Sequence, residues 1–217
     1  DSLSANELTG QFFDHPAKLE ITTKHREKQS VTQFRAESIV SPGALIQRFI
    51  PSWSKHIQGD THWTVKLDIP HKSNASPVKT VIRVQTNLEN IGIDLPAPLD
   101  KMPDEKRSLN ITTMLSKNER TFKVKYGNSI SSVIQFASGN GEMSLKRGKI
   151  NINSGKIIDL PSAGIRIAGK DIKHFSYDDW VSIAENTQEF NTGKNAGPLT
   201  WLSSIKANIH EFTAFGQ

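Results

Sequence analysis

An alternation of apolar and polar residues runs through most of the chain and limits its fold more than any other feature. It is clearest over residues 61–69, where Trp63, Val65, Leu67 and Ile69 alternate with polar residues. An extended chain places such residues on one side, whereas a helix would spread them around its axis. The pattern therefore predicts a sheet with one apolar face and one polar, solvent-exposed face, as in many antiparallel sheets.

The same alternation recurs before and after this run. It predicts further strands at residues 8–13, 18–23, 31–40, 78–86, 156–160, 165–168 and 199–215. Between residues 108 and 153, four alternating runs are separated by short turns rich in Gly, Asn and Ser, which is typical of a meander of hairpins. The apolar parity of the last run changes at Gly148, which predicts a β-bulge there.

Two short helices interrupt the strands. Ser41 and Pro42 form a start signal, with serine at the cap and proline in the first turn, and Pro51 stops or kinks this helix. The second helix begins after Ser176, with Asp179 placed to complete a capping box. The residues thus predict a mainly β chain with two short helices, of the α+β class, spanning residues 1–217 as one β-rich segment.

Residues 91–107 contain three prolines within eight positions, between two predicted strands. Proline lacks the N–H that a central strand donates, so this segment is not ordinary sheet. We interpret Leu95, Pro96, Pro98 and Leu99 as a stiff rim or crossover at a sheet edge, where unwanted pairing is blocked. A boundary between two subdomains near residues 91–107 is the alternative.

Composition excludes several classes of protein. The net charge of +5 is spread along the chain, and no basic run is interleaved with aromatic residues, so nucleic acid is not an expected partner. The absence of cysteine excludes disulfides, thiolate catalysis and cysteine-ligated zinc. No apolar stretch approaches the length of a membrane span. Because the chain begins with Asp and shows no signal peptide, we expect a piece of a longer protein.

No catalytic constellation is apparent. The seven histidines are scattered, Asp178 and Asp179 are explained by a helix cap, and the glycine-rich residues 138–141 by a hairpin turn. The sequence therefore predicts a protein that is not an enzyme and has neither cofactor nor metal. The four tryptophans leave an alternative open, a β module that binds an envelope glycan or polymer, which requires exposed and coplanar Trp rings.

Several short motifs, in a fixed order, resemble the YhdP branch of the AsmA-like superfamily of bacterial envelope proteins. The resemblance covers residues 8–217 and depends more on order and spacing than on any one motif, of which Leu95–Leu99 (LPAPL) is the most specific. The others are Gln58–Trp63, Asn87–Asp94, Lys125–Gly127, Arg147–Gly148, Leu160–Ile165, Gly169, Asp178–Trp180 and Phe215–Gly216.

The resemblance implies a location and a function. Members of this branch are long periplasmic proteins, anchored in the inner membrane of Gram-negative bacteria. They resemble bridge-like lipid transfer proteins, in which a strongly curved antiparallel sheet forms an open apolar groove. This implies a segment that helps to carry phospholipid between the inner and outer membranes. Its partners would be phospholipid acyl chains and neighbouring segments of the same long chain.

A groove for acyl chains needs an apolar concave face and no catalytic group, because burial of apolar area is not directional. We expect lysines such as Lys66, Lys123 and Lys125 to keep the opposite face soluble. On the residues alone, an ordinary α+β core without a cavity remains an alternative, in which the helices cover the sheet. The candidate groove residues are Trp63, Val65, Leu67, Ile82, Val84, Ile111, Phe122, Val124, Ile134 and Phe136.

Overall fold

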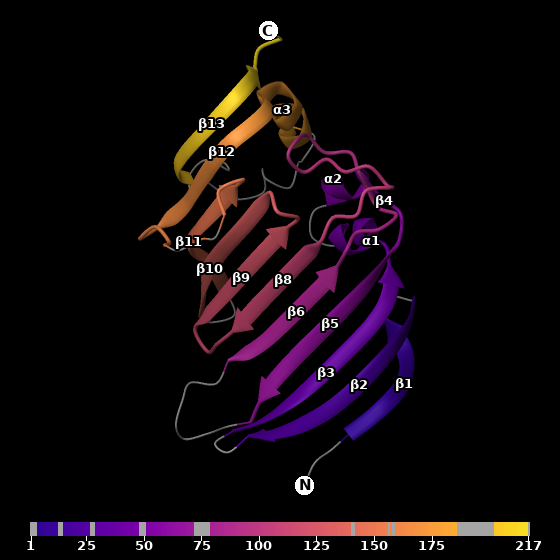
Figure 1. Ribbon diagram of the computed structural model, residues 1–217. Helices are drawn as coiled ribbons and strands as arrows, with labels where there is room; N and C mark the ends of the chain where they lie inside the picture. The colour runs from indigo at the N-terminus through magenta and orange to yellow at the C-terminus, as the bar shows by residue number, and fades with distance from the viewer. Residues whose placement is uncertain are drawn as a thin grey trace.

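One large open sheet forms most of the molecule (Figure 1). The computed structural model describes residues 4–12, 15–26, 29–47, 51–71, 79–139, 142–155, 157, 159–185 and 202–216. Eleven strands pair in the order β1-β2-β3-β5-β6-β8-β9-β10-β11-β12-β13. Their bounds are β1 Ser4–Phe12, β2 His15–Arg26, β3 Gln29–Val40, β5 Thr61–Pro70, β6 Thr80–Thr86, β8 Leu109–Leu115, β9 Glu119–Tyr126, β10 Ile130–Gly139, β11 Glu142–Ile152, β12 Gly164–Ser176 and β13 Leu202–Thr213.

The alternating runs form strands, as predicted, because each can turn its apolar residues to one face. The observed strands are often longer than the apolar pattern, and β12 extends eight residues past the predicted end at Ala168. The predicted strand at residues 156–160 is wrong for its described residues, which lie outside any strand. Residues 13, 78 and 199–201, at the ends of three other predicted strands, lie outside the described residues.

The predicted meander is confirmed as the antiparallel strands β8 to β11. Its bulge lies close to Gly148 but not at it. Gln135 pairs with Arg147 and Phe136 with Leu145, so Lys146 is the additional residue. Because the bulge absorbs one residue, Leu145 and Ile150 reach the same face despite their odd spacing.

The expectation of a fully antiparallel sheet is wrong at its C-terminal end. Strands β11 and β12 pair in parallel, and so do β12 and β13. A parallel partner needs a crossover connection instead of a tight turn. The chain provides one over residues 153–163, and a second that begins with α3 (Tyr177–Glu185). The sheet is therefore mixed, and apolar periodicity does not report strand direction.

The first predicted helix is divided into α1 (Pro42–Ile46) and α2 (Pro51–Ser54). The Ser41 hydroxyl caps α1 by accepting a hydrogen bond from the Ala44 amide at 3.3 Å. The predicted second cap is also present, since the Ser176 hydroxyl accepts from the Asp179 amide at 3.2 Å. A two-stranded sheet of β4 (Ile57–Gln58) and β7 (Gly92–Ile93) follows the first helices.

Residues 94–100 pair with no strand, which agrees with the predicted effect of the prolines. Their predicted position at a sheet edge is wrong, because they connect β6 to β8, which are neighbours in the middle of the sheet. The connection lies at the strand ends, beside the helices (Figure 1). Proline is tolerated here because the connection leaves the sheet before the prolines and returns after them.

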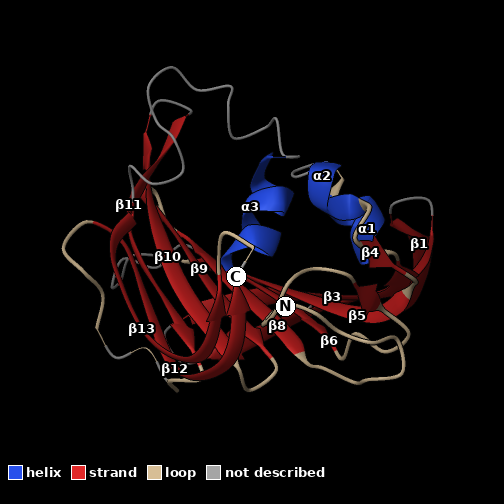
Figure 2. Cartoon of the chain, turned by 90° about the horizontal axis from the view of Figure 1, so that it is seen from above, coloured by secondary structure: helices blue, strands red, loops and turns tan. Residues whose placement is uncertain are grey.

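The sheet is strongly curved, and α1, α2 and α3 all lie on its concave side (Figure 2). The main buried core lies between this helical end and the sheet. It consists of Ile57, Leu88, Ile91 and Tyr126, against which Ile46, Ile93, Leu99, Leu109 and Ile130 pack. The helices therefore cover one end of the concave face, and they position the candidate site.

Candidate functional site

Cross-strand pairing brings the predicted apolar residues onto one face of the sheet. In a regular sheet, directly paired residues point to the same side. One row of paired residues crosses all eleven strands: Leu8, Leu19, Ala36, Val65, Val84, Ile111, Val124, Ser132, Ile150, Ile167 and Ile205. Ser132 is its only residue with a polar side chain.

A second row runs beside the first, two residues away along nine of the strands and three residues away along β1 and β13, where the register shifts. It contains Ala5, Ile21, Phe34, Leu67, Ile82, Thr113, Phe122, Ile134, Gly148, Ile165 and Leu202. Trp63 and Phe136 lie two residues from members of these rows and so share their face. All ten predicted groove residues thus lie on one face, which we call the apolar wall. Phe122 and Phe136 meet on it edge to face, with ring centroids 5.6 Å apart.

A cap made of α1, β4 and residues 87–93 lies over one end of the apolar wall. Gly43 of α1 sits so close to β4 that an added Cβ would lie 2.5 Å from the Ile57 carbonyl oxygen. This close approach requires glycine. Between cap and wall is a pocket of about 430 Å³, lined by Ile46, Ile57 and Leu88 from the cap and by Val65, Val84 and Ile111 from the wall, among other apolar or aromatic residues.

The cap divides the ten predicted residues into two groups. Four of them line the pocket, namely Trp63, Val65, Val84 and Ile111. The other six are half-buried along the wall beyond it. Sequence reasoning missed Leu88 and Ile91 as site residues, because they lie in a turn where no periodicity marks them. Leu88 is almost fully buried despite a positive φ of 50°.

Hydrogen bonds to backbone carbonyls hold the proline segment against the sheet. The Tyr126 hydroxyl donates to the Leu99 oxygen at 2.9 Å, and the Arg107 guanidinium lies over the Tyr126 ring at 5.0 Å. The buried Lys101 ammonium donates to the Ile91 oxygen at 2.7 Å and to the Met102 oxygen at 2.9 Å. Burial lowers the pKa of Lys101 and raises that of Tyr126. Because Ile91 belongs to the cap, the Lys101 hydrogen bond also connects the cap to the proline segment and holds it in place.

Helix α3 reaches the same end of the concave face from the C-terminal side. The Trp180 indole donates to the Ala97 oxygen at 3.1 Å, and its ring lies 6.5 Å from that of Trp53. These two rings are half-buried and inclined by 51°, and Trp63 is buried. The alternative of a glycan-binding module required exposed and coplanar Trp rings, and these three tryptophans do not provide them. Trp201 lies outside the described residues.

The opposite face of the sheet carries charged and polar side chains, including the predicted Lys66, Lys123 and Lys125. On it, the Asp68 carboxylate accepts hydrogen bonds from Arg83 and, at 2.7 Å, from the Gln33 amide. Burial raises the pKa of Asp68, but these two hydrogen bonds outweigh burial and leave the pKa below its usual value of 3.8. The charged form of Asp68 thus stabilises the fold.

This shift predicts a pH dependence of stability. Since the pKa of Asp68 is lower in the folded state, its contribution is complete above the unfolded pKa and is lost as pH falls through 3.8 and below. We expect Asp68→Asn to lower the free energy of unfolding by about 1 kcal/mol at pH 7, and by much less near pH 3. Urea unfolding at several pH values measures this, with the exposed Asp104→Asn as control. An equal difference at all pH values would contradict the assignment.

The described residues offer a continuous apolar surface, and among them no catalytic group of recognisable geometry is seen. No group of three or more His, Asp or Glu residues within the described ranges could hold a metal ion. Among the described helices, none has both the length and the apolar character needed to span a bilayer. What the wall can do chemically is to take hydrocarbon out of water, at about 0.8 kcal/mol per methylene.

Comparison with known proteins identifies the family. A family model described as YhdP protein matches residues 1–217, which is the whole chain. The chain belongs to the YhdP family. No curated protein and no solved structure matches it. Members of the YhdP family are envelope-associated and related to lipid transport, and they are not known as enzymes.

Proposed function

We propose that this chain is a non-catalytic segment of a periplasmic protein, anchored in the inner membrane elsewhere in its chain, that carries phospholipid between the inner and outer membranes. Acyl chains lie against the apolar wall on the concave face, and the phosphate-bearing headgroups face water on the open side of the curved sheet. Neighbouring segments of the same long chain continue the wall. Family membership supports the class of function, and the wall supports its mechanism.

One observation carries the proposal: two adjacent rows of paired residues remain almost wholly apolar across all eleven strands. A closed core would need a second layer over the full length of this face. The described helices lie over one end of it, and the six wall residues beyond the pocket stay half-buried. Such a surface needs another apolar occupant, and hydrocarbon fits without directional bonds.

Site-specific photocrosslinking tests the proposal. Benzoylphenylalanine is introduced at Phe122 on the wall or, in a separate protein, at Lys123 on the opposite face. Each purified protein is then irradiated with vesicles of radiolabelled phospholipid. We expect labelled protein from position 122 and almost none from position 123, because the two side chains point to opposite sides of the same strand. Equal labelling, or none from position 122, would overturn the proposal.

A further inference from the structure

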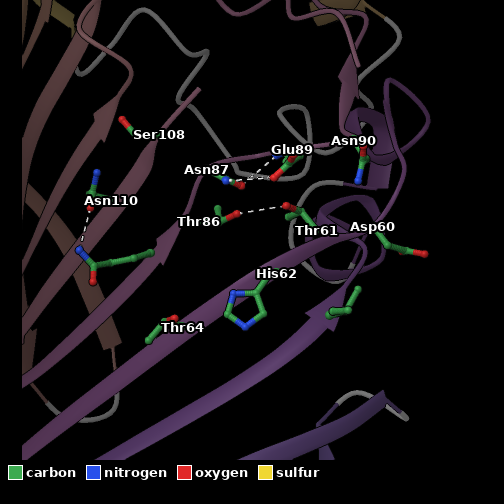
Figure 3. A pocket seen from close by; sticks show the side chains of 12 residues that line it. Asp60, Thr61, His62, Thr64, Thr86, Asn87, Glu89, Asn90, Ser108 and Asn110 are labelled. Atoms are coloured by element: carbon green, nitrogen blue, oxygen red, sulfur yellow. Dashed lines mark hydrogen bonds between the residues drawn. The ribbon is translucent and has the colours of Figure 1, made fainter. Parts of the chain in front are cut away.

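A second pocket lies at one end of strands β5, β6 and β8 and is lined in part by Asn87, Glu89 and Asn90 of the cap. It shares no lining residue with the apolar pocket, and its lining is polar where that of the first is apolar. It measures about 540 Å³, and eleven of its twelve lining residues are polar (Figure 3). Across the sheet, Thr64 pairs with Gln85, and Gln85 with Asn110. Each of the three is adjacent in sequence to a residue of the apolar wall, so they face away from it.

The amides of this pocket retain hydrogen-bonding capacity. The Gln85 amide nitrogen donates to the Asn110 amide oxygen at 2.9 Å. Within the described part of the chain, the Gln85 amide oxygen and the Asn110 amide nitrogen make no hydrogen bond to another protein group. The pair therefore leaves one acceptor, on Gln85, and one donor, on Asn110, for hydroxyl groups of a ligand, which can both donate and accept.

The far side of the pocket is a rigid turn. The Asn87 amide oxygen accepts from the Glu89 backbone N–H at 3.1 Å, and its nitrogen donates to the Glu89 carboxylate at 3.3 Å. Asn90 has a positive φ of 64°, and a Cβ added to Gly59 would lie 2.2 Å from the Asn90 oxygen. The two turns are thus tightly packed together, so the polar groups are held in place before any ligand arrives.

The charges around the pocket select against anions. No lysine or arginine is among its lining residues, although the chain carries a net charge of +5. Its acidic residues are Asp60 and Glu89, and a hydrogen bond from the Lys106 ammonium at 2.7 Å lowers the pKa of Glu89, so the carboxylate is ionised and already paired with a cation. A phosphate would meet no lysine or arginine in the lining. An uncharged ligand with many hydroxyl groups meets complementary groups, together with the exposed apolar side chain of Ile39.

We infer that this pocket binds an uncharged glycan, through amide and hydroxyl side chains and not through tryptophan. The site lies outside the proposed lipid path, and so the chain would contact a sugar polymer or a sugar headgroup with one face and hydrocarbon with the other. A fixed polar pocket would let the protein attach to a glycan without obstructing the apolar wall.

Amide chemical shifts test the inference by two-dimensional NMR on the full chain. The probes are a β-1,4-linked N-acetylglucosamine tetramer and maltotetraose. We expect saturable shifts around residues 85–90 and 110 with at least one of them. Asn110→Ala and Gln85→Ala should each weaken binding by up to about tenfold, as expected for the loss of one hydrogen bond. Thr112→Ala, on the same face of β8 but outside the pocket, should leave binding unchanged.

A second set of experiments separates a free glycan from a membrane-borne one. Phosphatidylcholine vesicles with or without a digalactosyl lipid are sedimented with the protein, and binding that needs the sugar lipid and is lost in Asn110→Ala assigns a headgroup. The inference is overturned if neither oligosaccharide shifts these amides at millimolar concentration and the sugar lipid adds no binding. That outcome leaves crosslinking at position 122 untouched, since the two faces are independent.

Discussion

Val124→Asp is expected to lower the amount of phospholipid that co-purifies with the protein, while the sheet stays folded. Val124 lies near the middle of the apolar wall, between Ile111 on β8 and Ser132 on β10. A carboxylate there stays hydrated in the empty protein, but hydrocarbon lying over it would have to displace that water at a cost of several kcal/mol. Lipid extraction with mass spectrometry should show at least about a tenfold fall in bound phospholipid per protein.

The matched control is Lys125→Asp, which introduces the same side chain one residue further along β9, on the opposite face. It should retain the lipid of the unaltered protein. Ser132→Asp provides a second wall variant at a position that is already polar, in case Val124→Asp fails to fold; circular dichroism monitors the sheet in each. Retention of lipid by both folded wall variants, or equal loss in Lys125→Asp, would show that the wall does not hold the lipid.

Ile91→Ala is expected to cause the largest loss of stability. Ile91 has no exposed surface and lies in the core cluster with Ile57, Leu88 and Tyr126. Removing three carbons leaves a cavity, and the turn around it is too constrained to collapse, because Leu88 has a positive φ. Such substitutions cost about 2–5 kcal/mol. Urea unfolding of both proteins at pH 7 measures the difference in the free energy of unfolding.

Ile205→Ala makes the same chemical change on β13, where the side chain is 61% exposed. It should alter the free energy of unfolding by no more than about 0.5 kcal/mol. A loss below about 1 kcal/mol in Ile91→Ala would mean that the cap is loosely packed on the wall. The apolar pocket would then be open instead of bounded by a fixed structure.

The identity of the wall residues could be predicted from sequence because of strand geometry alone. Side chains alternate with a period of two, so any residue two positions from Val65 shares its face as long as the strand continues. The helix caps at Ser41 and Ser176 were also predictable, because the hydrogen bond spans only three residues. These features depend on neighbours in the chain, and local sequence contains the whole of their physical cause.

The positions of the bulge and of the proline segment were predicted less well. Gly148 marked a change of parity, but the additional residue is Lys146, since a bulge is defined by the pairing of both strands. Similarly, three prolines excluded a strand but could not show that residues 94–100 connect two central strands. Both errors concern which strand lies beside which, and nothing in a local pattern reports this.

The sequence by itself determined that the chain is a sheet with one apolar face, and which side chains form it wherever the register does not shift, because alternation depends only on the geometry of an extended backbone. The tertiary structure alone decided that β12 and β13 run parallel to their neighbours, that the turn containing Leu88 and Ile91 closes a pocket, and that Gln85 and Asn110 meet on the other side. Those arrangements arise from contacts between residues far apart in the chain, whose free energies depend on the whole fold and not on any single segment.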